Sequence, residues 1–421
     1  MGIIGPENGL ARHRPIAFYV PKNVDPKTIP KGMRQCSAYL LNTIHWKRIC
    51  WQADRRGYVR LMNEFIVRVI PQDMWPLLRT RLEGLGILEV DSHFVKGKRS
   101  MGYRIASEYR KTRRVACTDP RLAERIERAY RSETVPWLPV HKQLAASLDR
   151  LTMNMNQAAQ IIPSLMPDDC EMDPAEYQRI AWHQCERIAN QDHRPVVCKY
   201  GRFHTLITSL AKDLRPCLRL DGEPLVGVDL ANSQPLILGI LARQYWFSKQ
   251  AAHRLRERRY TMNSNPYNGR QLRRAKAASD DLNRYMDVCQ AGQLYESLMQ
   301  PGDDRNKLKT ALLTALYGKN HWRSRLRDHY EKTYPSVAQM LKQVKRKDHA
   351  RAAHLMQNAE STLFIGTIAA GLLEHHPNMP LVTIHDGLYT TERHLDTVRQ
   401  AIIAEFQKID VHPTLHEERH Q

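Results

Sequence analysis

The sequence of 421 residues has no long apolar run, no closely paired cysteines and a shortage of acidic residues. A helix that crosses a bilayer needs about 20 consecutive apolar residues, and the N-terminal stretch MGIIGPENGLARHRPIAF has no apolar core of a secretory signal. We therefore expect a cytoplasmic protein, from a bacterial or phage-infected cell, with no membrane partner. The eight cysteines include no CxxC pair and the 19 histidines no HExxH pattern, so neither disulfides nor a zinc site is predicted.

The shortage of acids leaves a strong positive charge. Lys and Arg total 64 against 44 Asp and Glu, a formal net charge of +20. Such an excess favours a polyanionic partner, and nucleic acid is the first choice. The length is sufficient for two or more domains with separate cores.

The N-terminal third suggests a nucleic-acid-binding domain. Residues 1–34 are rich in Pro, Gly and Lys and predict an extended arm. In residues 35–110, the helical spacing of Trp75, Leu78, Leu82 and Leu85 predicts a helix that stops at Gly84 and Gly86. Two strand-like segments follow around a basic turn, which completes the outline of a winged helix. The same fold can serve protein contacts instead. If it binds DNA or RNA, the predicted contacts come from the helix and the basic turn: Arg79, Arg81, Lys96, Lys98 and Arg99.

Residues 111–195 look mainly helical, and DPRLAERIERAYR and DPAEYQRIAWHQCERIAN each predict a helix that starts at an Asp-Pro cap. Short strands with acids at their ends begin at Val196. Asp229 lies near the end of the apolar strand VGVDL, and Asp386 lies at the turn of a predicted hairpin, TIHDGL. A single acid at a strand end is usually a cap or turn residue. Two acids on neighbouring strands repel one another unless divalent cations neutralise them. The pair therefore predicts a site for two Mg²⁺ ions, with Mn²⁺ as a substitute and the Leu230 carbonyl as a further ligand.

The stretch RNKLKTALLTALYG, residues 305–318, predicts an amphipathic helix. Arg305 and Lys309 are four residues apart and share one face, and Tyr317 lies about 12 Å further along near that face. Two cations so placed can hold a triphosphate while the tyrosine meets the nucleoside. The alternative is a basic surface helix that ends at Gly318.

Three stretches, in the same order, resemble the motifs shared by A-family DNA polymerases and single-subunit phage-type RNA polymerases. VGVDLANSQPL carries the metal-binding Asp229, RNKLKTALLTALYG fits the pattern R-x3-K-x7-Y-G, and TIHDGL carries His385 and Asp386. The resemblance implies an α+β chain, mostly helical, with an antiparallel palm-type sheet that bears the catalytic aspartates, helical fingers and an N-terminal winged-helix-like domain. The implied ranges are a thumb-like linker at 111–195 and palm and fingers at 196–421, with the fingers at roughly 243–350.

The resemblance also assigns roles to residues. It implies catalytic Asp229, Asp386, Lys309 and His385, and nucleotide binding by Arg305, Lys309, Tyr317 and Gly318. KYGRFHT is similar to a template-contacting element of the RNA polymerases, and RAAHLMQNAEST is similar to a primer-template segment of the DNA polymerases. Further nucleic-acid contacts are therefore expected from Gly201, Arg202 and Gln357.

Three departures from the DNA-polymerase pattern favour ribonucleotides. Gln234 stands where those enzymes carry a glutamate that blocks a 2′-hydroxyl, Gly387 replaces the Glu after His-Asp, and Leu313 replaces an aromatic residue. We therefore predict an RNA polymerase or primase that acts on a DNA template with nucleoside triphosphates, Tyr317 sensing the ribose. The chain is roughly half as long as the familiar RNA polymerases, which favours priming or replication on a mobile element or phage. An A-family DNA polymerase is the alternative.

Two other classes remain open. A non-catalytic winged-helix replication initiator or regulator explains the charge and the N-terminal pattern, but it leaves the spacing of Arg305, Lys309 and Tyr317 as coincidence. A metal-dependent nuclease or transposase also uses two Mg²⁺ ions, but it needs no triphosphate clamp. Its third acid would be Glu360.

Overall fold

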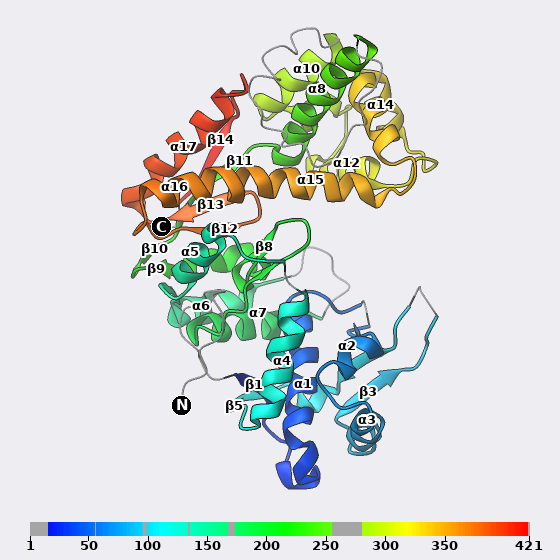
Figure 1. Cartoon of the computed structure of the whole chain (residues 1–421), viewed down its shortest axis with the longest axis vertical. Coiled ribbons are helices and arrows are strands. Elements are labelled where there is room, and N and C mark those ends of the chain that lie inside the picture. The colour runs from blue at the N-terminus through cyan, green and yellow to red at the C-terminus, as the bar shows by residue number, and fades with distance from the viewer. Residues whose placement is uncertain are drawn as a thin grey trace. The chain divides into compact units, whose positions relative to one another are not determined.

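The structure is a computed structural model that describes residues 16–54, 56–95, 99–133, 135–166, 173–254 and 280–419. It divides into two compact units, and Figure 1 labels many of their elements. Unit 1 comprises residues 1–136, 151–195 and 205–218, and unit 2 comprises residues 137–150, 196–204 and 219–421.

These boundaries differ from the predicted ranges at two places. Residues 137–150, expected in the helical linker, belong to unit 2 because α5 (Pro139–Leu148) packs there, where the Leu381 N–H donates to Ser147 Oγ at 3.2 Å. Residues 205–218 belong to unit 1, where Gln184 Nε2 donates to the Ser209 carbonyl at 2.8 Å. Contacts distant in sequence therefore decide which unit each segment joins.

Unit 1 begins with a two-stranded sheet. Strand β1 (Ala17–Pro21) pairs antiparallel with β5 (Thr112–Ala116), and Phe18 is fully buried. Part of the expected extended arm is thus a strand, because Ala17, Phe18 and Tyr19 of its apolar run are buried in the core. Residues 1–15 of that arm lie outside the described part of the chain.

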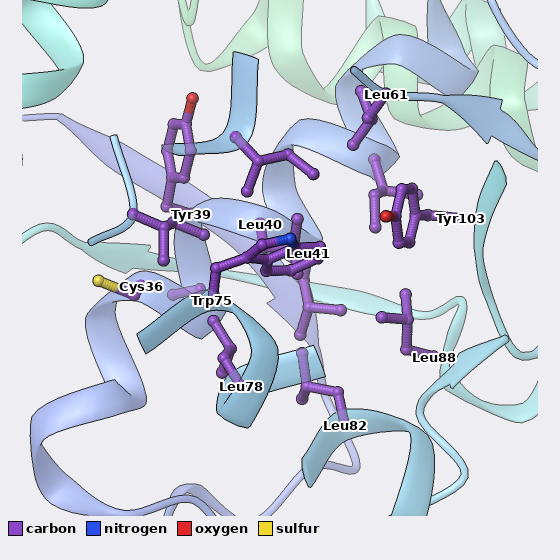
Figure 2. Packing of buried hydrophobic residues seen from close by; sticks show 14 of the residues in the cluster. Cys36, Tyr39, Leu40, Leu41, Leu61, Trp75, Leu78, Leu82, Leu88 and Tyr103 are labelled. Atoms are coloured by element: carbon purple, nitrogen blue, oxygen red, sulfur yellow. The ribbon is translucent and has the colours of Figure 1, made fainter. Parts of the chain in front are cut away.

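A helix-and-sheet group follows in unit 1. Its elements are, in order, α1 (Arg34–Ile49), β2 (Val59–Arg60), α2 (Asn63–Val67), α3 (Met74–Gly84), β3 (Leu88–Asp91) and β4 (Gly102–Ile105). The strands form an antiparallel sheet in the order β2-β4-β3. Trp75, Leu78 and Leu82 form the buried face of α3, as their helical spacing predicts, and they join the cluster shown in Figure 2.

The rest of unit 1 is mainly helical. It contains α4 (Pro120–Glu133), β6 (Leu151–Met153), α6 (Met155–Ile161) and α7 (Pro174–Ala189). Short 3₁₀ turns connect these elements: η1 (Pro26–Thr28), η2 (Lys31–Met33), η3 (Ser107–Tyr109), η4 (Ile162–Ser164), η5 (Leu206–Ser209) and η6 (Lys212–Cys217). Helix α7 starts at the predicted Asp-Pro cap, where Asp173 accepts a hydrogen bond from the Ala175 N–H at 3.2 Å.

Unit 2 is built around a four-stranded antiparallel sheet in the order β12-β13-β11-β14. Its strands are β11 (Val226–Leu230), β12 (Val382–Ile384), β13 (Gly387–Thr390) and β14 (Leu415–Arg419). Helix α17 (Leu395–Gln407) packs against β11 and β13. Two short hairpin pairings accompany the sheet: β7 (Val196–Val197) with β8 (Phe203–His204), and β9 (Leu218–Leu220) with β10 (Glu223–Pro224).

The other helices of unit 2 lie between β11 and β12 in sequence. They are α8 (Ser233–Arg254), α10 (Asp280–Gln290), α11 (Leu294–Leu298), α12 (Arg305–Tyr317), α13 (Arg325–Thr333), α14 (Pro335–Val344), α15 (Ala350–Leu363) and α16 (Ala370–His375). A π-helical turn, η7 (Phe364–Ala369), joins α15 to α16, so Figure 1 shows one long helix. The short η8 (Glu392–His394) precedes α17.

This combination of helices with small antiparallel sheets confirms the predicted α+β class. The predicted hairpin around His385 and Asp386 is also present, as β12 and β13. Within the described ranges, no helix has the length and apolar character needed to cross a membrane.

Candidate active site

The sheet of unit 2 brings the two predicted aspartates to the same end of adjacent strands. Strand β11 pairs antiparallel with β13, and the last recorded pair is Val228 with Leu388. One further step of this register puts Asp229 opposite Gly387, and opposing residues have Cα atoms about 4.5–5.5 Å apart. Asp386 immediately precedes Gly387, and both aspartates are partly exposed. The two carboxylates therefore belong to one small region at the sheet edge.

A tight turn presents Asp386. The hairpin closes between Ile384 and Gly387, which leaves His385 and Asp386 as the two turn residues. His385 adopts φ = 55°, a left-handed conformation that few residues with a side chain occupy. Its side chain is exposed. The structure thus gives His385 a backbone role in the turn.

Tyr389 explains why residue 387 is a glycine. A Cβ atom built on Gly387 would lie 2.7 Å from Tyr389 Cε2, and a Cβ on Gly227 would also overlap that ring. The ring is buried, and its hydroxyl donates to Glu418 Oε2 at 2.8 Å. A glutamate after His-Asp would displace this tyrosine. The departure from the DNA-polymerase pattern at residue 387 therefore has a local packing cause.

The donor chemistry of this region fits hard divalent cations. Mg²⁺ takes oxygen ligands and is commonly held by one or two protein carboxylates together with substrate phosphates and water. Asp229 and Asp386 supply the carboxylates, and the Leu230 carbonyl follows Asp229 directly in β11. Asp229 Oδ1 accepts a hydrogen bond from the Leu230 N–H at 2.8 Å. Within the described residues, no group of three His, Cys, Asp or Glu side chains forms a complete metal cage.

Helix α12 carries the predicted triphosphate clamp. It starts at Asp304, which accepts a hydrogen bond from the Lys307 N–H at 2.8 Å, and its buried stripe is Leu308, Leu312 and Leu316. Lys309 is exposed and has no recorded side-chain partner among the described residues. Its ammonium group is therefore available to a ligand.

Arg305 differs from Lys309 because it already has a partner. Its Nε donates to Glu296 Oε1 at 2.5 Å, and its guanidinium lies 5.3 Å from the centre of the Tyr295 ring. Burial raises the pKa of Tyr295; Arg305 lowers it and Asp386 adds to the rise, so Tyr295 lies within electrostatic reach of both. Binding of a triphosphate by Arg305 would require release of Glu296.

Tyr317 is joined to α8 and α15 by a chain of hydrogen bonds. Its hydroxyl donates to Gln234 Oε1 at 2.5 Å, and Gln234 Nε2 donates to Glu360 Oε2 at 3.5 Å. A carboxylate only accepts and the phenol donates here, so both partners fix the orientation of the Gln234 amide. Burial raises the pKa of Tyr317, which keeps its hydroxyl protonated.

The chain of bonds ends in a buried ion pair. Arg202 Nη2 lies 2.8 and 2.9 Å from the two carboxylate oxygens of Glu360, whose side chain is only 4% exposed. Burial raises the pKa of Glu360, Arg202 opposes the rise, and Asp386 contributes to it. The charge of Asp386 thus disfavours ionisation of Glu360. The sequence suggested Glu360 only as the third acid of a nuclease or transposase site. Its pairing with Arg202 was not predicted, because Arg202 is 158 residues away.

Three other predicted residues lie near this chain of bonds. Gly201 has φ = 81°, and a Cβ built on it would lie 3.2 Å from Ser361 Cβ, so it allows close packing on α15. Gln357 lies three residues before Glu360, on the same side of α15. Gly318 is buried and ends α12, where its carbonyl accepts from Lys345 Nζ at 3.1 Å. Lys345, which the sequence did not single out, thus caps this helix.

In unit 1, two of the arginines predicted to contact nucleic acid interact with other residues of the protein. Arg81 donates to the Thr28 carbonyl at 2.6 and 3.0 Å, and Arg79 forms an i,i+4 pair with Glu83 at 3.6 Å. Leu77 on the exposed side of α3 is 61% accessible. The accessible surface of α3 is thus less basic than the sequence predicted.

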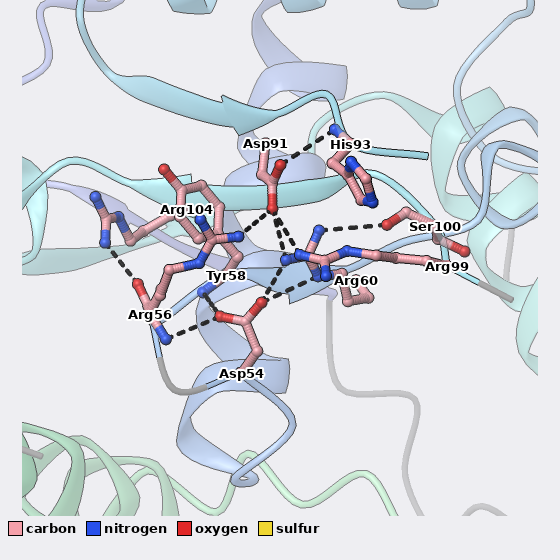
Figure 3. A network of polar contacts seen from close by, with 9 residues as sticks. All are labelled: Asp54, Arg56, Tyr58, Arg60, Asp91, His93, Arg99, Ser100 and Arg104. Atoms are coloured by element: carbon pink, nitrogen blue, oxygen red, sulfur yellow. Dashed lines mark hydrogen bonds and ion pairs between the residues drawn. The ribbon is translucent and has the colours of Figure 1, made fainter. Parts of the chain in front are cut away.

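The basic turn after β3 is anchored by an arginine–aspartate network (Figure 3). Asp91 accepts from Arg99 at 3.0 Å, from Arg60 at 2.7 Å and from Arg56 at 2.6 Å. These bonds, led by that from Arg60, hold the pKa of Asp91 well below its usual range. Arg99 therefore fixes the base of the turn, while Lys96 and Lys98 lie outside the described residues.

Comparisons with known proteins give little independent guidance. No family model matches the sequence, and no curated protein matches it. Among solved structures, the chain is similar to the polymerase domain of Pol1 from M. smegmatis, in a complex with DNA primer-template and dNTP. That likeness has a TM-score of 0.38 and 10% sequence identity, and covers 89% of this chain and 80% of that chain. Such a low TM-score does not establish a shared fold, so the function rests on the geometry of the site.

Proposed function

We propose that unit 2 is a template-directed nucleotidyltransferase, an RNA polymerase or primase. One observation carries the proposal: the register of β11 and β13, continued by one step, puts Asp229 opposite Gly387, the residue that follows Asp386. The charge of Asp386 also contributes to the raised pKa of two residues beside α12: Tyr295, whose ring lies 5.3 Å from the Arg305 guanidinium at the start of that helix, and Glu360, which is linked through Gln234 to Tyr317 at its end. A carboxylate pair, a cationic clamp and a nucleoside contact are the parts that nucleotide addition needs.

The reaction joins a hydroxyl of the growing chain to the α-phosphorus of a nucleoside triphosphate and releases pyrophosphate. Divalent cations at Asp229 and Asp386, when bound, lower the pKa of the attacking hydroxyl and stabilise charge on the leaving group. Lys309 binds the triphosphate oxygens with its free ammonium group. Arg305 exchanges Glu296 for phosphate as the substrate enters, which adds a second cation where negative charge develops.

Recognition of the sugar depends on Tyr317. Because its proton is donated to Gln234, the hydroxyl oxygen faces the substrate as an acceptor, which suits the 2′-hydroxyl of a ribonucleotide. Glu360 and Arg202 act as positioning residues, since they hold Gln234 in one orientation. This arrangement supports ribonucleotide use over the alternative, an A-family type DNA polymerase.

The rival classes fit these contacts less well. A nuclease or transposase would need Glu360 as a third metal ligand, yet both oxygens of that carboxylate face Arg202 and the side chain is buried. A non-catalytic initiator gives no reason for the spacing of Arg305, Lys309 and Tyr317 on α12. The order α1, β2, α2, α3, β3, β4 in unit 1 supports a winged-helix domain that binds template nucleic acid through phosphate contacts.

Competition between ATP and dATP on one single-stranded DNA template tests the sugar preference. We expect wild type to incorporate ATP preferentially, and Tyr317→Phe to lose most of the discrimination because it lacks the hydroxyl. His321→Ala, a change on the loop after α12, is the control. Strict preference for dATP would favour the DNA-polymerase alternative, while DNA binding without incorporation would favour the initiator.

A further inference from the structure

Unit 1 contains a partly buried cluster in which three guanidinium groups share one carboxylate. Glu176 on α7 accepts from Arg110 at 2.8 Å and also pairs with Arg48 of α1 and Arg179 of α7. The Glu176 and Arg48 side chains are only 10% and 11% exposed. The cluster combines α1, α7 and the segment after η3, so segments distant in sequence create it.

The charges of this cluster do not balance. Three arginines face one glutamate, which leaves two positive charges without a counterion in the cluster. Burial lowers the pKa of Arg48 to about 10; Glu176 opposes this effect, while Arg110 and Arg179 add to it. Uncompensated cations in a partly buried site cost free energy, and an anion at the cluster would offset that cost.

A small cavity lies against the same side chains. Its volume is about 10 Å³, and its lining includes the three arginines together with His45 and His183. That volume is close to what one water-sized oxygen atom occupies. The cavity thus has room for one oxygen atom beside the arginines.

Three buried nitrogens around this cavity have no partner among the described residues: His45 Nε2, His183 Nε2 and Arg110 Nε. The two histidines are only 6% and 7% exposed. His183 Nδ1 donates to Glu186 Oε2 at 3.3 Å, so Nε2 of the neutral ring is an acceptor, whereas Arg110 Nε always carries a proton to donate. Their neighbours follow helical spacing: His45 and Arg48 are three residues apart on α1, and Arg179 and His183 are four apart on α7. Side chains of both helices therefore line the same cavity.

We propose that this cluster binds a phosphate group, with one phosphate oxygen in the cavity and the others beside the more exposed Arg179. An oxyanion fits because it supplies negative charge to the three arginines and an acceptor to the unpartnered Arg110 Nε–H. A phosphodiester of a nucleic acid and a free phosphate share this chemistry. The site lies within unit 1, so it does not depend on the reaction proposed for unit 2.

Thermal unfolding of the full chain in inorganic phosphate, against chloride at equal ionic strength, tests the site. We expect phosphate to raise the unfolding temperature of wild type, because a ligand that binds only the folded state stabilises it. Arg179→Gln should weaken phosphate binding by about 10-fold or more. Arg128→Gln removes an equal charge from a helix of the same unit, at a side chain that is 75% exposed, and should bind phosphate like wild type.

Two further measurements distinguish loss of phosphate binding from a folding defect and identify the source of the phosphate. Arg179→Lys keeps the charge and should restore part of the phosphate effect, which separates loss of binding from a folding defect. Titration of single-stranded DNA at several salt concentrations distinguishes the source of the phosphate. Loss of one phosphodiester contact lowers the slope of log K against log salt by about 0.7, whereas an unchanged slope with lost phosphate binding assigns the site to free phosphate. Equal phosphate effects in wild type and Arg179→Gln, or no effect in either, would overturn the proposal.

Discussion

Replacing Gln234 by glutamate should destabilise the hydrogen-bonded group of Tyr317, Gln234 and Glu360, because it introduces a second carboxylate beside Glu360. In the wild type, Gln234 Nε2 donates to Glu360 Oε2 at 3.5 Å. Gln234→Glu puts a second carboxylate at that distance from a glutamate that is only 3% exposed. At 3.5 Å and an effective dielectric constant of about 20, two negative charges repel by about 5 kcal/mol. Arg202 offsets part of this repulsion, and uptake of a proton by the pair limits the rest.

The cost of this substitution should depend on pH in a defined direction. The second carboxylate raises the folded-state pKa of the pair above its unfolded value, so the folded state binds the extra proton and stability falls as pH rises between the two values. Near pH 5 the pair can avoid the repulsion by binding one proton, and protonating a carboxyl with an ordinary pKa at that pH costs about 1 kcal/mol. We therefore expect the substitution to lower the stability by about that amount at pH 5. Near pH 8 the repulsion is fully present, and we expect a loss of about 3–5 kcal/mol.

Hydrogen exchange of the α12 and α15 amides in the full chain measures this loss as a local opening free energy. Gln400→Glu is the matched control, because Gln400 Nε2 lies 3.4 Å from Asp396 Oδ1 on the exposed surface of α17; it should cost only about 0.2–0.5 kcal/mol. Adding Glu360→Gln to Gln234→Glu removes the carboxylate pair and should remove the pH dependence. A cost equal to that of the control, or independent of pH, would refute the reasoning.

Two further predictions concern the clamp and the hairpin. Lys309→Ala should raise the KM for the nucleoside triphosphate about 10-fold or more, a loss of about 1.4 kcal/mol of binding. Lys307→Ala, two residues away on another face of α12, is the control and should change the KM little. Equal effects of the two substitutions in steady-state kinetics would contradict the proposed triphosphate clamp. Gly387→Ala should lower the unfolding free energy by about 1–3 kcal/mol because its Cβ overlaps Tyr389. Gly371→Ala, where a Cβ meets nothing within 4 Å, is the control for urea unfolding, and equal stability of the two variants would show that the ring moves freely.

Short-range patterns predicted much of the local structure. The Asp-Pro start of α7, the stripe of Trp75, Leu78 and Leu82 on α3, and the hairpin that carries Asp386 all follow from residues a few positions apart. The spacing from Arg305 to Tyr317 likewise defines one helix, α12, with the predicted bounds. Such features depend on backbone preference and helix geometry, which a single sequence contains.

Contacts between distant segments were not predictable in the same way. The ion pair of Arg202 with Glu360 and the contact of Arg81 with the Thr28 carbonyl depend on tertiary packing, so a sequence pattern cannot distinguish such arginines from free ones. Arg305 shows the same effect, because Glu296 occupies the guanidinium that the spacing assigned to a phosphate. The charge of a residue was therefore easier to predict than its availability to a ligand.

The central claim is that Asp229 and Asp386 together support nucleotide addition. The most direct measurement is a gel assay with purified full-length protein, Mg²⁺, labelled ribonucleotides and single-stranded DNA, with and without a primer. We expect template-dependent product that is lost on chelation of Mg²⁺ and in both Asp229→Asn and Asp386→Asn. Asp396→Asn, the same change at a side chain that is 81% exposed, should retain activity. Product that persists in either aspartate variant, or no product from wild type with any nucleotide set, would contradict the account.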